Sequence, residues 1–281
     1  MANIFEIGTA LALYSMLAWG IQDFLDKKTL KEIKPLNLLF FQHLFSLIVL
    51  MPFAFNYLSS FVLNQSILLI ILYGVLHIVA YYGMYTAFKK GKVSIMSPLV
   101  ASYPIITILL ALIIFKETLS IFKILGISLV IFGTIVISIE KVKDKMRTTK
   151  GLNYAALSML AWAVIFFLWK PIVSIFEVIL AIFLLRVSTV GLLLPSKFTL
   201  LNNFPRRLLV PILLIGILEL SGVVTYAYAN TLEQVSILVP IASAFPAVTI
   251  VLAWIFLKER PQKHQIIGIL LLLPALVILS I

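Results

Sequence analysis

Apolar residues occupy this sequence in runs of about 20, separated by short stretches of charged residues, Asn, Gly and Pro. A helix needs roughly 20 apolar residues to cross a bilayer core about 30 Å thick, so each run predicts one membrane-spanning helix. Ten runs qualify: Ile4–Leu25, Leu36–Phe55, Ser66–Phe88, Val93–Phe115, Leu119–Ile139, Gly151–Trp169, Ile172–Pro195, Leu208–Asn230, Val235–Leu257 and His264–Ile281. The sixth and seventh are separated only by Lys170-Pro171, where we expect a tight hairpin.

Composition makes lipid the main solvent of this chain. Hydrophobic residues make up 62% of it and charged residues 12%, whereas charged residues are about a quarter of soluble domains. The predicted fold class is therefore an all-α integral membrane protein. There is no cysteine, which excludes disulfides and thiolate metal sites. The first apolar run contains Glu6 and has no basic residue before it, so no secretory signal peptide is expected.

The net charge of +11 does not indicate a nucleic-acid partner, because the basic residues form short clusters between the apolar runs. The connections after the first, third, fifth, seventh and ninth helices carry 18 Lys and Arg residues, against three (Lys116, Lys123 and Lys170) on the opposite side. Cytoplasmic loops are enriched in Lys and Arg. We therefore expect a multi-pass plasma-membrane protein with the odd-numbered loops in the cytoplasm and both termini outside.

The sequence repeats itself at an offset of about 142 residues. The five residues Ser15–Trp19 recur as Ser158–Trp162. Further along, a second set recurs in register: Val93-Ser94-Ile95, Pro98, Pro104, Thr107, Lys116-Glu117 and Gly126 match Val235-Ser236-Ile237, Pro240, Pro246, Thr249, Lys258-Glu259 and Gly268. This predicts two homologous units, residues 1–142 and 151–281, joined by a basic linker at 143–150.

Each predicted unit contains five helices, an odd number, so the second unit must cross the membrane in the opposite sense to the first. Inverted repeats around a midplane site are typical of secondary transporters with alternating access. The chain resembles the drug/metabolite transporter superfamily, specifically its EamA branch, in the Ser-x-x-x-Trp, Pro-x5-Pro and Lys-Glu motifs and the five-plus-five layout. The resemblance covers essentially the whole chain. It implies ten helices around a central cavity and carriage of small metabolites, often amino acids, usually outward.

Four ionisable residues fall near the middle of predicted helices: His43, His77, Arg186 and Glu219. A charged group there costs roughly 2.5–3.5 kcal/mol on insertion scales, so such residues are expected to face the bundle interior or a wet cavity. The repeat aligns His43 with Arg186 and His77 with Glu219. We expect Arg186 to bind a substrate carboxylate or phosphate and Glu219 to take an ammonium group or a proton. The alternative is an Arg186–Glu219 ion pair, with hydrogen-bonded histidines, that serves packing alone.

Four prolines also occupy matching places in the two units: Pro98 and Pro104, and Pro240 and Pro246. A proline inside a helix removes one backbone hydrogen bond and frees carbonyl groups. We expect Pro104 and Pro246 to kink the fourth and ninth helices near mid-span and act in gating. Direct ligand contact by the freed carbonyls is the alternative to bending alone.

Trp19, Gln22, Asp23 and Asp26 share one face of the first helix, and Trp162 repeats the tryptophan. Asp26 is expected at the cytoplasmic interface, and Asp23, one turn deeper, is a candidate gate or proton site. The two tryptophans either stack on substrate or pack between helices.

Two further faces carry aromatic and hydrogen-bonding groups that would line a cavity or simply pack: His77, Tyr81 and Tyr85, and Glu219, Tyr226 and Asn230. Glu177 is expected to be exposed to water. The Lys-Glu pairs at 116–117 and 258–259 are expected to anchor helix ends at the membrane surface.

The residues together predict secondary transport of a small polar metabolite, zwitterionic or anionic, with proton exchange as a possible driving force. The sequence has no phosphate-binding loop for ATP and no metal-ligand or catalytic motif, so no cofactor, no metal and no enzyme activity are expected. Rival functions are efflux of lipophilic cations, which Arg186 opposes, and sugar-nucleotide transport, for which one deep Arg supplies little phosphate binding. A membrane-embedded enzyme or a non-transporting scaffold is the alternative of another class. A monomer is compatible with this layout.

Overall fold

A computed structural model describes residues 4–60, 66–90, 93–139, 151–196 and 206–280. These residues form helices and no strand. The helices before residue 140 are α1 (Ile4–Thr29), α2 (Pro35–Ala54), η1 (Phe55–Ser60), α3 (Ile67–Lys90), α4 (Val93–Val100), α5 (Tyr103–Ile114) and α6 (Ile121–Ser138). Those after residue 150 are α7 (Leu152–Ile175), α8 (Val178–Leu193), η2 (Leu194–Ser196), η4 (Arg206–Leu208), α9 (Leu209–Leu232), α10 (Val235–Ser243), α11 (Phe245–Leu257) and α12 (Lys263–Ser280). The predicted linker at 143–150 lies outside the described residues.

The helices are long and apolar enough for a multi-pass membrane protein. Seven segments qualify as membrane spans by length and composition. In this count the part of α4–α5 from Met96 to Ile114 is one span, and α10 with α11 is another. Helix α8 and most of α12 are shorter apolar helices. With α1 this agrees with the predicted ten-helix architecture. Large apolar side chains lie on the outside, among them Ile113 and Phe122, which are 72% and 70% exposed. Lipid is the environment in which such a surface is stable.

The hairpin predicted at Lys170-Pro171 is wrong. Helix α7 continues through Pro171 to Ile175, and α8 begins at Val178. The chain turns at Glu177, whose carboxylate accepts hydrogen bonds from the backbone N–H groups of Ile179 (2.8 Å) and Leu180 (3.3 Å). An acidic side chain in this position satisfies the free N–H groups at a helix start, which makes it a stronger boundary signal than a proline in a membrane helix.

Pro104 and Pro246 lie just after short interruptions of the fourth and ninth predicted helices. Helix α4 ends before Ala101, and Pro104 is the second residue of α5; likewise α10 ends at Ser243, and Pro246 is the second residue of α11. Pro104 and Pro246 are therefore not helix-interior residues. In the first turn of a helix a proline loses no hydrogen bond, because the N–H group there has no partner in any case.

Pro98 and Pro240 do lie inside helices, within α4 and α10. Their carbonyl oxygens accept hydrogen bonds from the hydroxyls of Ser102 (2.7 Å) and Ser243 (2.8 Å). These are not the carbonyls that Pro104 and Pro246 were expected to free, which belong to the residues four positions earlier, Val100 and Ala242.

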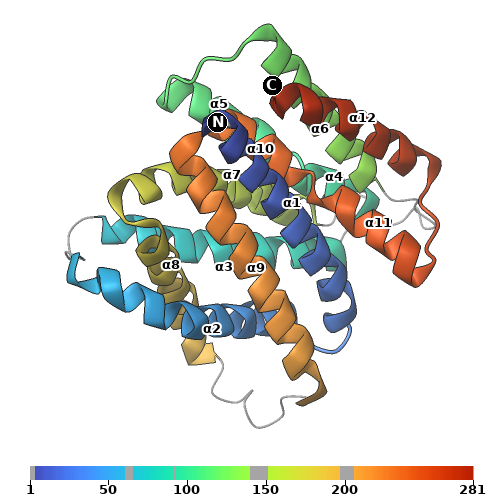
Figure 1. Ribbon diagram of the computed structural model, residues 1–281. Coiled ribbons are helices and arrows are strands. Elements are labelled where there is room, and N and C mark those ends of the chain that lie inside the picture. Colours follow the sequence, from blue (N-terminus) through green and yellow to red (C-terminus); the bar gives the residue numbers. More distant parts are fainter. Residues whose placement is uncertain (1–3, 61–65, 91–92, 140–150, 197–205, 281) are drawn as a thin grey trace.

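Helices from the two parts of the chain pack in matching pairs. Helix α1 lies along α9 and α3 along α7, while α6 lies along α12 and α2 contacts α8. Figure 1 shows α1 (dark blue) beside α9 (orange), and α6 (green) beside α12 (dark red). In the sequence repeat α1 corresponds to α7, α2 to α8, α3 to α9 and α6 to α12. The α1–α9 pair is therefore the counterpart of the α7–α3 pair. The α2–α8 and α6–α12 pairs each join a helix to its own counterpart.

The serines of the repeated Ser-x-x-x-Trp motif fasten these pairs. The Ser15 hydroxyl on α1 lies 2.8 Å from the Thr225 hydroxyl on α9. The Ser158 hydroxyl on α7 donates to the carbonyl oxygen of Ala80 on α3 at 2.8 Å. Each serine therefore ties its helix to a helix of the other half.

The repeated threonines make a second set of matching bonds. The Thr107 hydroxyl on α5 donates to the carbonyl oxygen of Ala163 on α7 at 3.0 Å. The Thr249 hydroxyl on α11 donates to the carbonyl oxygen of Gly20 on α1 at 3.1 Å. Since Ala163 and Gly20 are also equivalent in the repeat, the two bonds are counterparts of each other.

Candidate functional site

The four deep ionisable residues form one connected set inside the bundle. Nη2 of Arg186 (α8) lies 2.7 Å from each carboxylate oxygen of Glu219 (α9). Nη1 of Arg186 lies 2.9 Å from Nε2 of His43 (α2), which is in turn 3.1 Å from Nδ1 of His77 (α3). The Arg186 and Glu219 side chains are 1% and 7% exposed, and both histidines are buried. The order of contacts is thus His77, His43, Arg186, Glu219.

The geometry assigns the protons of the two histidines. A guanidinium group can only donate hydrogen bonds, so Nε2 of His43 must be the acceptor toward Arg186. His43 is then neutral, with its proton on Nδ1. The Nδ1 of His77 faces Nε2 of His43 and carries a proton, which it donates to that nitrogen. Nδ1 of His43 and Nε of Arg186 are buried without a hydrogen-bond partner among the described residues. The set therefore has unused donors.

The contacts follow the sequence repeat. His43 and Arg186 are repeat-equivalent and touch each other, and His77 and Glu219 are equivalent and lie at the two ends of the set. The Arg186–Glu219 contact is accordingly the counterpart of the His43–His77 contact, in which the rings stack with centroids 4.9 Å apart.

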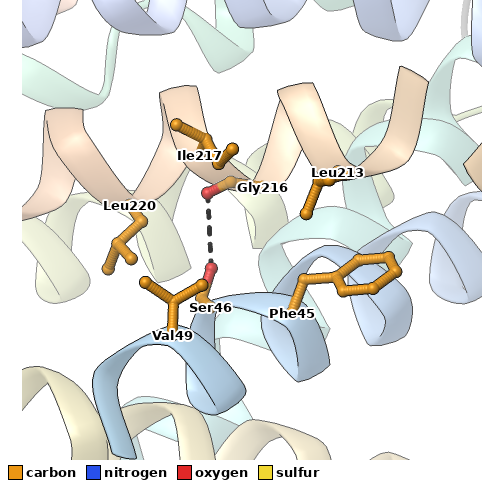
Figure 2. A pocket seen from close by; sticks show the side chains of 7 residues that line it. All are labelled: Phe45, Ser46, Val49, Leu213, Gly216, Ile217 and Leu220. Atoms are coloured by element: carbon orange, nitrogen blue, oxygen red, sulfur yellow. Dashed lines mark hydrogen bonds between the residues drawn. The ribbon is translucent and has the colours of Figure 1, made fainter. Parts of the chain in front are cut away.

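The close approach of α2 and α9 positions His43 and Glu219. A side chain at Gly216 would place its Cβ 3.1 Å from the carbonyl oxygen of Gln42, so glycine allows the two backbones to come together. The Ser46 hydroxyl, one turn from His43, reaches the Gly216 carbonyl oxygen at 3.4 Å (Figure 2). The crevice around this bond is lined mainly by apolar side chains and has a volume of only about 10 Å³.

A larger hollow of about 270 Å³ lies among α1, α11 and α12. Its lining is aliphatic and includes Met16, Val248 and Leu272. Neither hollow is lined by any of the four ionisable residues, whose charged groups are occupied by one another.

Aromatic rings cover the His77 end of the set. The His77 ring meets the rings of Tyr81 and Trp162 edge to face, at centroid distances of 5.3 and 5.6 Å. Tyr81 and Trp162 also contact each other at 5.3 Å. Tyr73, which the sequence did not single out, is buried against His77 at 5.5 Å.

Trp19 lies in a second aromatic cluster with Tyr226 and Phe166. Its ring centroid is 5.8 Å from that of Phe166 and 5.6 Å from that of Tyr226. Tyr226 is fully buried. Phe166 also stacks on Tyr103 at 4.8 Å and lies 6.2 Å from Trp162, so it links the two clusters. Sequence reasoning missed Phe166, although it follows Trp162 by one helical turn.

The two acidic residues on this face of α1 differ in burial. Asp23 is exposed, whereas Asp26 is buried and accepts a hydrogen bond from Gln22 at 3.3 Å. The other carboxylate oxygen of Asp26 is buried with no hydrogen-bond partner in the part of the chain that the structure describes. Asp26, not Asp23, is thus the enclosed acid of this face.

Glu117 is the other residue whose importance the sequence did not reveal. Glu117 was expected to anchor a helix end at the membrane surface, but its side chain is only 4% exposed. Its two carboxylate oxygens accept hydrogen bonds from the backbone N–H groups of Val235 and Ser236, each at 3.0 Å, and Lys170 Nζ lies 3.0 Å from Oε1. Burial raises the pKa of Glu117, but hydrogen bonds from Ser236 and the nearby Lys170 ammonium outweigh it and hold the pKa below its ordinary value. The repeated Lys-Glu was the available signal.

The described residues contain no group of three or more His, Asp and Glu side chains arranged to hold a metal ion. The chemistry that the set offers is instead the recognition of opposite charges. Arg186 presents a planar donor group suited to a carboxylate, Glu219 an acceptor suited to an ammonium group, and His43 a neutral acceptor beside them.

Comparison with known proteins agrees with this architecture. The profile of the EamA-like transporter family matches the chain twice, over residues 6–139 and 149–281. An uncharacterized transporter of Archaeoglobus fulgidus is 23% identical over a 279-residue alignment that covers 96% of each chain. An uncharacterized protein of Methanocaldococcus jannaschii is 32% identical over 135 residues, which are 47% of this chain and 98% of that protein.

One solved crystal structure superposes with a TM-score of 0.74 at 14% identity, covering 96% of this chain and 95% of the other. At 14% identity, the match shows that the two proteins share a fold. The two profile matches together cover nearly all of the sequence. The chain therefore belongs to the EamA-like transporter family.

Proposed function

We propose that this protein is a secondary active transporter that exports a small zwitterionic metabolite, such as an amino acid, across the plasma membrane by alternating access of two inverted halves. The observation that carries the proposal is the buried pair of opposite charges, Arg186 and Glu219, 2.7 Å apart. Two charges enclosed in membrane helices are costly, and a transport site is a common reason for keeping them.

A zwitterion fits this pair because it can enter without leaving a buried charge alone. Its carboxylate would replace Glu219 on the guanidinium group of Arg186, and its ammonium group would take the carboxylate of Glu219. One ion pair becomes two, and the net charge of the site stays zero. A lone cation would leave Arg186 without an anion, and an arginine cannot shed its proton to compensate.

For an anionic substrate, the same arrangement would give proton exchange. When a substrate carboxylate occupies Arg186, Glu219 loses its partner, and a proton is the simplest replacement for a substrate that lacks an ammonium group. Return of the Arg186–Glu219 pair would expel that proton. His43 and His77 extend the set and supply neutral ring nitrogens for proton movement.

Alternating access is supported by the matching contacts of the two halves. The serine and threonine bonds between α1 and α9, α7 and α3, α5 and α7, and α11 and α1 occur at repeat-equivalent positions. Halves with equivalent contacts can exchange conformations at little cost, which would open one site to either side in turn. With the loop charges as they are, the odd-numbered loops would face the cytoplasm.

The test begins with a thermal-shift screen of the purified protein against amino acids, lipophilic cations, sugar nucleotides and organic acids, since a ligand of the native state raises the melting temperature. Transport of the best ligand is then measured in proteoliposomes with the double variant Arg186→Met/Glu219→Leu, which removes both charges together. We expect flux to fall at least 100-fold, while Val187→Leu, the neighbour that is 43% exposed, leaves it unchanged. Unaltered flux and affinity in the double variant would overturn the proposed site.

A further inference from the structure

One face of α7 connects the buried charges to the Glu117 contact. Trp162, Phe166 and Lys170 follow one another at intervals of four residues and so lie on the same side of the helix. Trp162 contacts His77, Phe166 contacts Trp19 and Tyr226, and Lys170 contacts Glu117. The Glu117 contact therefore closes the end of a helix face that leads through packed aromatic rings to the charged set.

Glu117 supplies a cap that α10 does not have in its own sequence. Gln234, the residue before α10, makes no capping hydrogen bond with its side chain. The first N–H groups of a helix have no partner within the helix and form the positive end of its dipole. Glu117 satisfies two of them from the loop between α5 and α6, so the cap joins the first half of the chain to the second.

Lys170 and two phenylalanines reinforce this junction. The Lys170 ammonium lies 5.5 Å from the centre of the Phe115 ring, and the Phe115 and Phe167 rings stack with centroids 4.7 Å apart. The junction thus brings together the end of α5, the start of α10 and the last two turns of α7.

The repeat places an equivalent set at the other end of the molecule. Lys116 and Lys258 both have the left-handed backbone conformation, with φ of 53° and 56°, close after the ends of α5 and α11. The residue after Lys258 is Glu259, which is exposed, whereas Glu117 is buried. Because α10 and α11 together cross the bundle, the start of α10 and the end of α11 lie at opposite ends (Figure 1). The Glu117 contact and its repeat counterpart therefore lie at opposite ends of the molecule.

We propose that Glu117, Lys170 and the start of α10 form a lock that keeps one end of the transport path closed, and that Glu259 with the start of α4 is the corresponding lock of the opposite end. The inference rests on the alternating access proposed above. In the conformation described, the Glu117 lock is engaged. Its release would let α10 move away from the α5–α6 loop and give access past Phe166 to the charged set.

The absence of cysteine from the chain makes the lock directly measurable. Ser243→Cys introduces a single thiol at the last residue of α10, where the side chain is 2% exposed. Its rate of reaction with a membrane-impermeant maleimide is measured in proteoliposomes without substrate, with the reagent added at the Glu117 side. Glu117→Gln keeps the shape of the side chain but removes its charge.

We expect Glu117→Gln to raise the labelling rate about tenfold, which corresponds to about 1.4 kcal/mol in the opening equilibrium. Lys170→Met, which leaves the cap of α10 in place, should give a smaller rise of about threefold. Lys116→Met, beside Glu117 but exposed, is the matched control and should label like the parent. Glu259→Gln should not raise labelling from this side.

Labelling that is unchanged in both Glu117→Gln and Lys170→Met would overturn the lock. If Glu117→Gln does not fold by gel filtration, the Lys170→Met rate decides alone. The labelling readout needs no substrate, so it is independent of the proposed site. If labelling responds as expected but the double variant of Arg186 and Glu219 still transports, the proposed site is refuted and the lock stands.

Discussion

The ion pair between Arg186 and Glu219 predicts an unusual pattern of stabilities. The perturbations are Arg186→Met and Glu219→Leu, made separately and together. With charge centres about 4 Å apart and an effective dielectric constant of about 20, the attraction is about 4 kcal/mol. The desolvation of two buried ions offsets most of this, so the intact pair contributes little net stability. Removing one ion, however, leaves the other buried and alone, at a cost of about 3–5 kcal/mol.

Each single variant should therefore unfold with an equilibrium constant at least 100-fold higher than the parent, whereas the double variant should stay within about tenfold of it. The two singles should also respond differently to pH. In Arg186→Met, Glu219 can become neutral by taking a proton, which for an ordinary carboxyl group of pKa about 4.3 costs about 3.7 kcal/mol at pH 7 and about 1.4 kcal/mol less for each pH unit below that. In Glu219→Leu the arginine keeps its charge, so its penalty should not change between pH 7 and 5.5.

The assay is equilibrium unfolding in mixed detergent micelles containing increasing dodecyl sulfate, followed by the fluorescence of the four tryptophans at pH 7 and 5.5. Val187→Leu, at the exposed neighbouring position, controls for changes in α8 itself. A double variant whose loss equals the sum of the two singles would refute the reasoning, because additive effects mean that the two ions are not partners in the native protein.

Three further predictions use the same unfolding assay or a thermal melt. Glu177→Ala removes the cap of α8 and should cost about 1 kcal/mol, with Glu177→Asp close to the parent; no loss would mean that the cap is not formed. Gly222→Val would put its Cβ 2.6 Å from Nε1 of Trp19 and should cost about 1–3 kcal/mol, whereas an unchanged melting temperature would contradict the close packing. Because the pKa of Glu117 lies below its ordinary value of 4.5, its stabilisation is complete above that pH and is lost as the pH falls through the lowered pKa. The stability difference between the parent and Glu117→Gln should accordingly stay constant from pH 7 to 5 and shrink below about pH 4.5; a difference that changes between pH 7 and 5 would contradict it.

Sequence patterns were sufficient for the helices because membrane helices must be long and apolar, a constraint that acts locally. The same reasoning failed at Pro171, where a proline was taken for a chain break. In a membrane helix the neighbouring helices tolerate such a residue, and the real turn is set by the capping carboxylate of Glu177. Pro104 and Pro246 were located correctly as interruptions, but their exact role depends on where the next helix begins, which periodicity does not resolve.

The candidate site was predictable in its members and not in its contacts. Burial cost alone singled out Arg186 and Glu219, but whether they would bind each other or stand apart depends on helix packing. Glu117 was misjudged for the same reason: next to Lys116 it has the sequence of a surface anchor. Only the fold brings Lys170 and the start of α10 to its carboxylate, across 53 and 118 residues of chain.

The divergence of the two halves at the centre has a physical cause. His43 and Arg186 are repeat-equivalent and lie 2.9 Å apart, so they meet where the two halves face each other. Two identical residues at such a place would face their own copies, and a pair of buried arginines would repel each other with no anion between them. A neutral histidine opposite Arg186 removes that repulsion and accepts a hydrogen bond, while Glu219 supplies the countercharge on one side only. Elsewhere the repeat keeps the same serines, threonines and lysines, because contacts between hydroxyl and carbonyl groups tolerate symmetry. Buried charges that face their own copies repel each other, so the site must be asymmetric, whereas contacts of hydroxyl and carbonyl groups allow the scaffold to be symmetric. Replacing His43 with Arg should therefore prevent folding, even though the repeat already places an arginine at the equivalent position.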